Sequence, residues 1–228
     1  MTDVATNLQV LLNRIRTLEQ TYHRAPNSVS LLAVSKSQSA SLIETLACAG
    51  QQDFGENYLQ EALIKISALS HQQLSWHFIG PIQSKKAPLI AQYFSWVHTV
   101  CRLKEAQLLS KQRSHELGPL NICIQVKLDA DPNRSGIAIS EVPSLIQAIK
   151  DLPQLKLRGL MTIAPISNDF KQQCFYYDQL KSLMDSLNDK NALDTLSMGM
   201  SDSIEAAIAK GATIVRVGTA LFGPRIDK

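Results

Sequence analysis

One lysine stands out among the residues that could do chemistry. Lys36 follows the apolar run LLAVS at residues 31–35, and no acidic residue lies within seven positions of it. An uncharged amine at the end of a buried strand is a nucleophile that forms an imine with an aldehyde. Burial or a nearby second cation would favour the uncharged form, because both lower the pKa of a lysine. The ordinary alternative is a lysine that extends along the rim or pairs with a carboxylate such as Glu56.

Two segments near the end of the chain combine glycines with hydroxyl groups. They are SMGMSDS at residues 197–203 and RVGTALFG at residues 216–223. Gly218 permits a close approach of the backbone, and Ser201 and Thr219 add hydroxyl donors. Backbone N–H groups at the start of a helix attract anions. Together the two segments favour a site for a phosphate monoester.

Ordinary helix capping is the alternative explanation for the first of these segments. Asp202 and Glu205 are three residues apart, as in a capping box, and Gly211 could end the same helix. The phosphate site is favoured because the second segment offers similar donors.

Arg216 lies two residues before Gly218, which places the two on the same face of a strand. It could be the second cation that lowers the pKa of Lys36. Opposite a pyridine nitrogen, an arginine donates a hydrogen bond without losing its proton, so the ring stays unprotonated and is a poor electron sink. The alternative is a salt bridge inside the fold. With a phosphate site and an amine together, the aldehyde would belong to a sugar phosphate or to pyridoxal phosphate.

Short apolar runs alternate with helical patterns along the chain. Eight runs are predicted as strands, at residues 29–35, 52–55, 74–80, 96–100, 120–128, 155–162, 194–199 and 212–218. Helices are predicted at 40–49, 57–69, 84–93, 102–117, 140–150, 169–190 and 203–210. Strands joined by helical crossovers pair in parallel, and eight such units predict an α/β fold, a single (β/α)8 TIM barrel. An open doubly wound sheet is the alternative, although no GxGxxG follows the first strand.

The first part of the chain predicts an extra N-terminal helix over residues 3–24. Leu8, Leu11 and Ile15 lie on one face of it, at the spacing of an amphipathic helix. No linker interrupts the pattern that follows, so residues 1–228 are predicted to form one domain. In such barrels the reactive residues lie at the carboxyl ends of the strands, where Lys36 and Gly218 fall.

Composition excludes several classes of protein. The chain has 228 residues, 45% of them hydrophobic and 19% charged, as expected of a globular protein. The net charge of +3 comes from scattered basic residues, which does not suggest a nucleic-acid partner. The four cysteines lack metal-ligand spacing, so no metal is predicted. No signal peptide or membrane segment is predicted, and we expect a cytoplasmic protein that is a monomer.

Five motifs together resemble the pyridoxal phosphate homeostasis protein family. They are AVSK at 33–36, GENY at 55–58, WHFIGPIQSKK at 76–86, RGLMTIAP at 158–165 and LSMGMSDSIEAAIAKGATIVRVGTALFG at 196–223. The resemblance covers essentially the whole chain in the expected order. It implies a (β/α)8 barrel similar to the N-terminal domain of alanine racemases, with pyridoxal 5'-phosphate as the cofactor.

The resemblance also implies a role for each cofactor-binding position. Pyridoxal phosphate would be held as an imine, a Schiff base, on Lys36. Its phosphate would be received by Ser201, Gly218 and Thr219, and its pyridine nitrogen would face Arg216.

Three further positions follow from the same resemblance. Asn57 would border the cofactor, and His77 and Met200 would line its surroundings. The implied role is to carry or buffer pyridoxal phosphate in vitamin B6 homeostasis, with apo forms of pyridoxal-phosphate-dependent enzymes as possible recipients. No catalytic residue is predicted.

Two other functions remain open at this stage. A weak pyridoxal-phosphate-dependent racemase or lyase would need Tyr58, His77 or Lys86 for proton transfer. A two-base racemase needs a second acid or base from an additional domain, whereas this chain stops at Lys228, soon after the last predicted strand. An aldolase-like enzyme that uses Lys36 on a sugar phosphate is the third hypothesis.

The chain departs from the pattern of many bacterial members at two places. Gln38 and Arg134 stand where those members carry lysines. Gln38 cannot act as a spare amine, and an arginine is a poor imine former. A mechanism in which those lysines accept or hand over the cofactor is therefore in doubt here; the alternative is drift in solvent-exposed loops.

Overall fold

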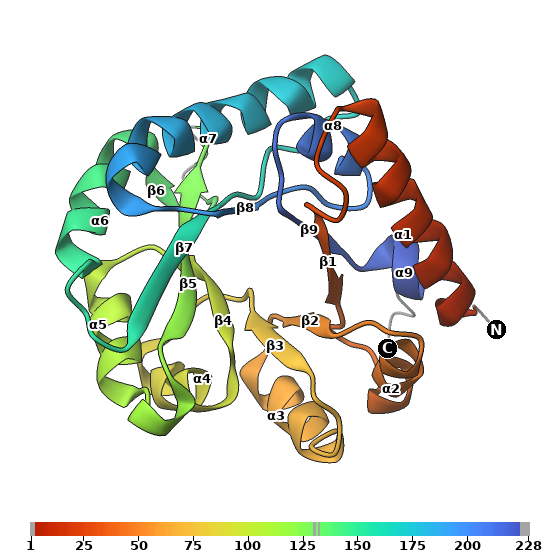
Figure 1. The fold of residues 1–228 in the computed structure, drawn as a ribbon. Helices are drawn as coiled ribbons and strands as arrows, with labels where there is room; N and C mark the ends of the chain where they lie inside the picture. Colours follow the sequence, from red (N-terminus) through yellow and green to blue (C-terminus); the bar gives the residue numbers. More distant parts are fainter. Residues whose placement is uncertain (1–2, 130, 132, 224–228) are drawn as a thin grey trace.

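A closed barrel of parallel strands with helices on its outside is formed by residues 3–129, 131 and 133–223, which the computed structural model describes (Figure 1). The barrel strands are β1 (Ser30–Val34), β2 (Asp53–Glu56), β3 (Ser75–Phe78), β4 (Trp96–Val100), β5 (Leu120–Lys127), β7 (Leu155–Met161), β8 (Thr195–Ser197) and β9 (Ile214–Val217). β1 pairs with β9, and β4 pairs with β5, so the ring has no open edge. The predicted TIM barrel is confirmed, and the doubly wound sheet is excluded.

Helices cover the outside of the ring. They are α1 (Val4–Thr21), α2 (Ala40–Cys48), α3 (Leu59–Ala68), α4 (Ala87–Tyr93), α5 (Leu103–Gln112), α6 (Val142–Ile149), α7 (Phe170–Asn191), α8 (Ile204–Ala209) and α9 (Thr219–Phe222), with short 3-10 turns at Ser84–Lys86, His115–Leu117 and Ile139–Glu141. No helix in the described ranges is long and apolar enough to cross a membrane.

The extra N-terminal helix packs on the outside of the barrel beside α8 and α9 (Figure 1). Its predicted apolar face is buried at Leu8, Leu11 and Ile15. Asp3 caps its first turn, because the Asp3 carboxylate accepts hydrogen bonds from the N–H groups of Ala5 and Thr6. The helix therefore supports the elements that carry the last two loops of the barrel.

Strand order places distant parts of the sequence side by side at the mouth of the barrel. Ala33 in β1 is paired with Val217 in β9, and Val34 is paired with Gly55 in β2. The segment that follows β1 is thus flanked by the segments that follow β2 and β9. All eight strands run parallel, so these segments leave from the same end.

Two short elements and one helix start differ from the sequence prediction. The two-residue strand β6 (Ile137–Ala138) and the four-residue helix α9 were not predicted, since each is too short to show a period. The capping box of Asp202 with Glu205 does not form. α8 begins after Ser203, and Glu205 instead accepts a hydrogen bond from the Tyr22 hydroxyl at 2.9 Å. Gly211 does end this helix, with a φ of 92°.

Candidate functional site

A cavity of about 170 Å³ at the mouth of the barrel gathers most of the predicted site residues. Its wall is formed by Val34, Lys36, Asn57, Ile79, Met161, Ile163, Met200, Ser201, Arg216, Gly218 and Thr219. Seven of the eight cofactor positions predicted from the sequence are among them. Arg216 comes from β9 itself, and the others come from the segments that follow β1, β2, β8 and β9, as the strand order requires.

The backbone before Lys36 is fixed by a buried lysine that sequence reasoning missed. Lys65 in α3 donates hydrogen bonds to the carbonyl oxygen of Ser35 at 2.7 Å and to Oε1 of Glu56 at 2.8 Å. The Ser35 hydroxyl donates to the same Glu56 oxygen at 2.6 Å. Burial raises the pKa of Glu56, although the hydrogen bonds from Lys65 and Ser35 act in the opposite direction. Glu56 thus forms an ion pair with Lys65 beneath the loop that carries Lys36.

The backbone after Lys36 is held in the same way. Ser37 has a φ of 62°, in the left-handed region, and its N–H donates to Oε1 of Glu61 at 2.5 Å. Glu61 also pairs with Lys65, so one lysine links the supports on both sides of Lys36. A non-glycine residue in this conformation persists only where its surroundings hold it.

Arg216 is buried, and its hydrogen bonds orient it. One terminal nitrogen, NH1, donates to the carbonyl oxygen of Ser197 at 2.6 Å and to its hydroxyl at 2.8 Å. The other, NH2, donates to the carbonyl oxygen of Thr162 at 2.7 Å. These acceptors, in the part of the chain that the structure describes, are carbonyl and hydroxyl oxygens rather than the carboxylate of a salt bridge. Burial lowers the pKa of Arg216 to about 10, below the usual range but high enough to keep the guanidinium charged at neutral pH.

The two glycine-containing loops meet at the start of α9. The N–H of Ala220 donates to the Ser201 hydroxyl at 3.4 Å, which ties the loop after β8 to the loop after β9. A Cβ on Gly218 would lie 3.3 Å from the carbonyl oxygen of Val34, so a side chain there would press on β1. Gly199 has a φ of 94°, and a Cβ on it would lie 2.5 Å from Cβ of Ala207. Both glycines are thus required by the close packing of the loops.

Asn57 contributes a buried acceptor to the cavity. Its Oδ1 atom has no hydrogen-bond partner among the described residues. A buried acceptor without a partner is costly, and a bound molecule with a donor group would relieve that cost. The backbone at Asn57 is fixed by Gly80, where a Cβ would overlap the Asn57 carbonyl.

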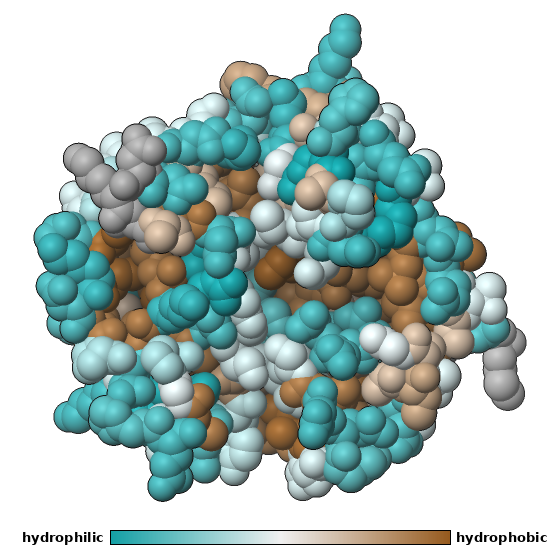
Figure 2. Space-filling view, in the orientation of Figure 1, coloured by the Kyte–Doolittle hydropathy of each residue, from teal (hydrophilic) through white to brown (hydrophobic). Residues whose placement is uncertain are grey.

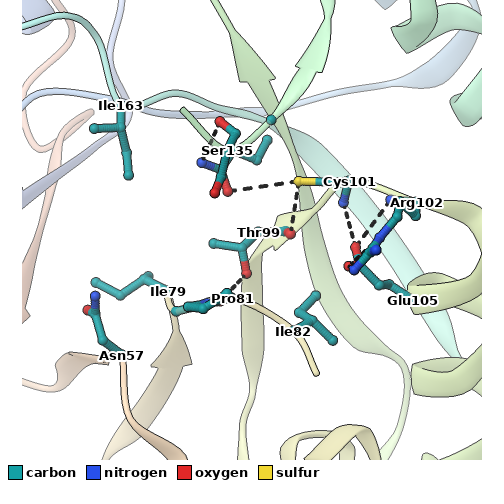
Figure 3. Close-up of a pocket in the computed structure, with 13 residues that line it drawn as sticks. Asn57, Ile79, Pro81, Ile82, Thr99, Cys101, Arg102, Glu105, Ser135 and Ile163 are labelled. Carbon is teal, nitrogen blue, oxygen red and sulfur yellow. Dashed lines mark hydrogen bonds and ion pairs between the residues drawn. The ribbon is translucent and has the colours of Figure 1, made fainter. Parts of the chain in front are cut away.

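A larger cavity of about 360 Å³ borders the first one and shares Asn57, Ile79 and Ile163 with it (Figure 3). Figure 3 shows Cys101 on its far wall, next to the pair of Arg102 and Glu105. Burial raises the pKa of the Cys101 thiol to about 12, so this thiol is not a nucleophile at neutral pH. The surface view shows hydrophobic residues near the centre of the face, between hydrophilic ones (Figure 2).

His77 is the one predicted site residue that lies elsewhere. It is not on the wall of the cavity but inside the barrel, where its Nδ1 is 2.9 Å from Nε2 of His98 and its Nε2 is 3.2 Å from Asp53. His77 is thus not on the described wall of this cavity, and its place in the surroundings of the cofactor stays a prediction. It lies on β3, one residue before the strand ends at Phe78, with its side chain inside the barrel below the mouth.

The two departures from the family pattern have different surroundings. The guanidinium of Arg134 forms an ion pair with Asp129 at 2.8 Å and reaches the carbonyl oxygen of Ile163 at 3.4 Å. Arg134 therefore links the loops after β5 and β7 and is not simply exposed. Gln38 is partly buried, and its N–H closes a turn on Ser35 at 3.0 Å. In the described residues, no group of histidine, cysteine and acidic side chains could hold a metal ion.

Comparison with known proteins identifies the class of the barrel. Residues 6–225 match the family described as alanine racemase, N-terminal domain. An alanine racemase from Clostridium difficile has the same fold, with a TM-score of 0.77 at 15% identity over 98% of this chain and 61% of that one. The barrel is thus of the alanine racemase N-terminal class.

Closer relatives narrow the assignment. Proteins named pyridoxal phosphate homeostasis protein from Pseudomonas aeruginosa and Escherichia coli K12 are 50% and 44% identical, over 99% of this chain and 97% and 98% of theirs. PipY of Synechococcus elongatus, in a structure described as having PLP bound, is 33% identical, with a TM-score of 0.85 over 97% of this chain and 100% of that one. This chain belongs to the pyridoxal phosphate homeostasis protein family.

Proposed function

We propose that this protein binds pyridoxal 5'-phosphate as a Schiff base on Lys36 and carries it for intracellular vitamin B6 homeostasis. The observation that supports this most is the shared cavity. It combines the side chain of Lys36, the donors of two glycine-containing loops and a buried arginine, Arg216. The names of the curated relatives and the PLP-bound PipY structure point to the same cofactor.

The residues present fit the cofactor in three ways. The bound cofactor would supply an aldehyde carbon, with which the Lys36 amine, in its uncharged form, would condense to form a C=N bond and release one water molecule. Ser201, Gly218 and Thr219 would receive the phosphate through hydroxyl and backbone N–H donors, beside the charge of Arg216. Asn57 Oδ1, buried and without a described partner, would gain a donor.

Arg216 favours carriage over strong carbanion chemistry. Both hydrogens of its NH1 group are engaged by Ser197, and one of NH2 by Thr162. The remaining N–H donors are those available to the cavity that Arg216 lines. A guanidinium with a pKa of about 10 donates to a pyridine nitrogen without protonating it, so the ring withdraws electrons weakly.

The positions of the candidate proton-transfer residues also favour a carrier over a racemase or lyase. Tyr58 is 59% exposed, Lys86 lies in a 3-10 turn, and His77 is inside the barrel. None of the three is on the described wall of the cavity. A group that moves a proton on a bound substrate must be within hydrogen-bond reach of it.

The proposal extends to the partners and setting of the protein. A reversible C=N bond suits transfer, and the recipients would be apo forms of pyridoxal-phosphate-dependent enzymes. We also propose that the protein is a monomer in the cytoplasm.

Titration with pyridoxal phosphate tests this function. The wild type should develop the visible absorbance of an imine and then activate an apo-enzyme in a time-dependent manner. Lys36→Ala should do neither, while Lys85→Ala, at an exposed lysine outside the cavity, should behave like the wild type. Absence of visible absorbance in the wild type would contradict the proposal. Amino-acid racemisation or cleavage well above that of free cofactor, and lost in Lys36→Ala, would favour the enzyme instead.

A further inference from the structure

An unbroken line of polar side chains crosses the interior of the barrel below the cavity. Arg216 NH1 donates to the Ser197 hydroxyl at 2.8 Å, and that hydroxyl is 2.9 Å from Nδ1 of His98. His98 Nε2 is 2.9 Å from Nδ1 of His77, whose Nε2 is 3.2 Å from Oδ1 of Asp53. The five residues belong to β9, β8, β4, β3 and β2. Both imidazoles are buried, whereas Asp53 begins its strand and is 38% exposed at the opposite end of the barrel.

The two ends of this line determine the direction of every hydrogen bond between them. A guanidinium only donates, and a carboxylate only accepts. Ser197 accepts from Arg216, which leaves its own hydrogen for Nδ1 of His98. A neutral His98 then carries its proton on Nε2 and donates to Nδ1 of His77. In turn His77 carries its proton on Nε2 and donates to Asp53.

The opposite direction is disfavoured at the Asp53 end. It would place the lone pair of His77 Nε2 3.2 Å from a carboxylate oxygen, where two acceptors repel. Charged imidazoles are disfavoured as well, because burial lowers the pKa of both His77 and His98, and each ring has little access to water. Ser75 is the other group at this end, with its hydroxyl 3.0 Å from His77 Nε2.

We propose that Asp53, His77, His98 and Ser197 form a donor chain that positions Arg216 and links it to a carboxylate at the far end of the barrel. The four are positioning residues, since they act on the cofactor through Arg216. The inference rests on the proposed function, in which Arg216 faces the pyridine nitrogen. It assigns a role to His77, which lies outside the cavity, to Ser197, and to His98, which no sequence motif identified.

The chain fixes Arg216 in a way that a single contact would not. Ser197 receives both NH1 hydrogens, one on its carbonyl and one on its hydroxyl. The hydroxyl is a stronger acceptor when its own hydrogen is donated onward, because hydrogen bonds in series polarise one another. Loss of the negative charge of Asp53 would weaken each hydrogen bond of the chain and leave both tautomers of His77 and His98 accessible.

Nitrogen NMR of histidine-labelled protein without cofactor tests the direction of the chain. His77 and His98, assigned through His77→Gln and His98→Gln, should both be neutral Nε2–H tautomers at pH 7. In Asp53→Asn both rings should show a measurable share of the Nδ1–H tautomer, whereas Ser75→Ala should leave them unchanged. An Nδ1–H tautomer or a charged ring in the wild type, or an unchanged tautomer in Asp53→Asn, would overturn the proposal.

Cofactor titration of the full chain tests the link to Arg216. Ser197→Ala should raise the Kd for pyridoxal phosphate about fivefold, or about 1 kcal/mol, and shift the imine absorbance. Asp53→Asn, at the rim far from the cavity, should change the Kd and the imine absorbance in the same direction but by less. Ser75→Ala should change neither the Kd nor the absorbance. If Asp53→Asn leaves both unchanged, the link is refuted even where Ser197→Ala fails to fold. Failure of the wild type to bind the cofactor would refute the proposed function, while the NMR result would still decide the direction of the chain.

Discussion

At the scale of single residues, the phosphate donors can be changed without changing the amine that forms the imine, so their effect on cofactor affinity can be measured separately. Ser201→Ala combined with Thr219→Ala removes two hydroxyl donors and leaves Lys36 in place. We expect a loss of about 1 to 3 kcal/mol in cofactor binding, roughly 5- to 150-fold in Kd, because hydrogen bonds to a charged group are the stronger ones. The imine absorbance at saturation should be unchanged. Ser140→Ala, at an exposed position outside this cavity, is the control, and full affinity in the double variant would mean that the phosphate binds elsewhere.

Arg216 is expected to act on the spectrum of the bound cofactor. Arg216→Gln keeps hydrogen-bonding groups but removes the charge opposite the ring. The imine absorbance should shift, and the Kd should rise. Lys85→Ala is a control for the loss of one positive charge. An unchanged absorbance spectrum at saturation would show that Arg216 does not face the ring nitrogen.

Seven of the eight predicted site residues lie on the wall of this cavity. Residue types and order along the chain singled out Lys36, Ser201, Arg216, Gly218 and Thr219, whereas Asn57 and Met200 came from the family resemblance. Lys36, Ser201 and Thr219 follow predicted strands and Gly218 ends one, and strand ends meet at one mouth in this fold. Lys65 could not be found in this way. Its partners lie 30 and 9 residues away, and nothing in a helical pattern distinguishes a buried lysine from an exposed one.

At the scale of elements, Lys65 joins α3 to the ends of β1 and β2. Lys65→Met would leave Glu56 buried without its cation, which typically costs about 3 to 5 kcal/mol. We expect lower stability together with weaker cofactor binding, because both supports of the Lys36 loop depend on Lys65. Urea unfolding and cofactor titration measure the two effects. Lys111→Met, at an exposed position in α5, is the matched control. If Lys65→Met binds the cofactor with wild-type affinity, the Lys36 loop keeps its conformation without Lys65.

Element boundaries were predicted more closely than capping contacts. β4 was predicted at 96–100, as observed, because aromatic and β-branched residues favour a strand there, and its residues after Trp96 are buried. α8 was predicted to start at residue 203 and starts at Ile204. The capping box that Asp202 and Glu205 could form is absent, because Glu205 accepts a hydrogen bond from the Tyr22 hydroxyl instead. The order of β1 next to β9 followed from the barrel topology rather than from any local signal.

At the scale of the whole molecule, the buried histidine pair predicts a pH dependence of folding. The folded pKa values of His77 and His98 lie below the usual 6.5, so the unfolded chain binds protons that the folded chain does not. Stability from this pair is present above pH about 6.5 and is lost as the pH falls. The slope reaches at most about 1.4 kcal/mol per pH unit for each histidine.

Urea unfolding of wild type and His98→Gln between pH 5 and about 7.5 measures this slope. The variant should lose stability less steeply on acidification than the wild type. Asp53 and Arg216 flank the pair and are present in both proteins, and Glu56, whose raised pKa acts in the opposite direction, is also common to both. Parallel curves for the two proteins would show that His98 does not titrate on unfolding.

The most direct measurement of the central claim is reduction of the cofactor-loaded protein with borohydride, followed by peptide mapping. Borohydride converts the C=N bond to a stable amine and so marks the attachment site. We predict one modified peptide, with the label on Lys36. In the Lys36→Ala variant the same peptide should carry no label. A label confined to another lysine would contradict the account. So would cofactor that binds to the protein but can still be washed away after reduction.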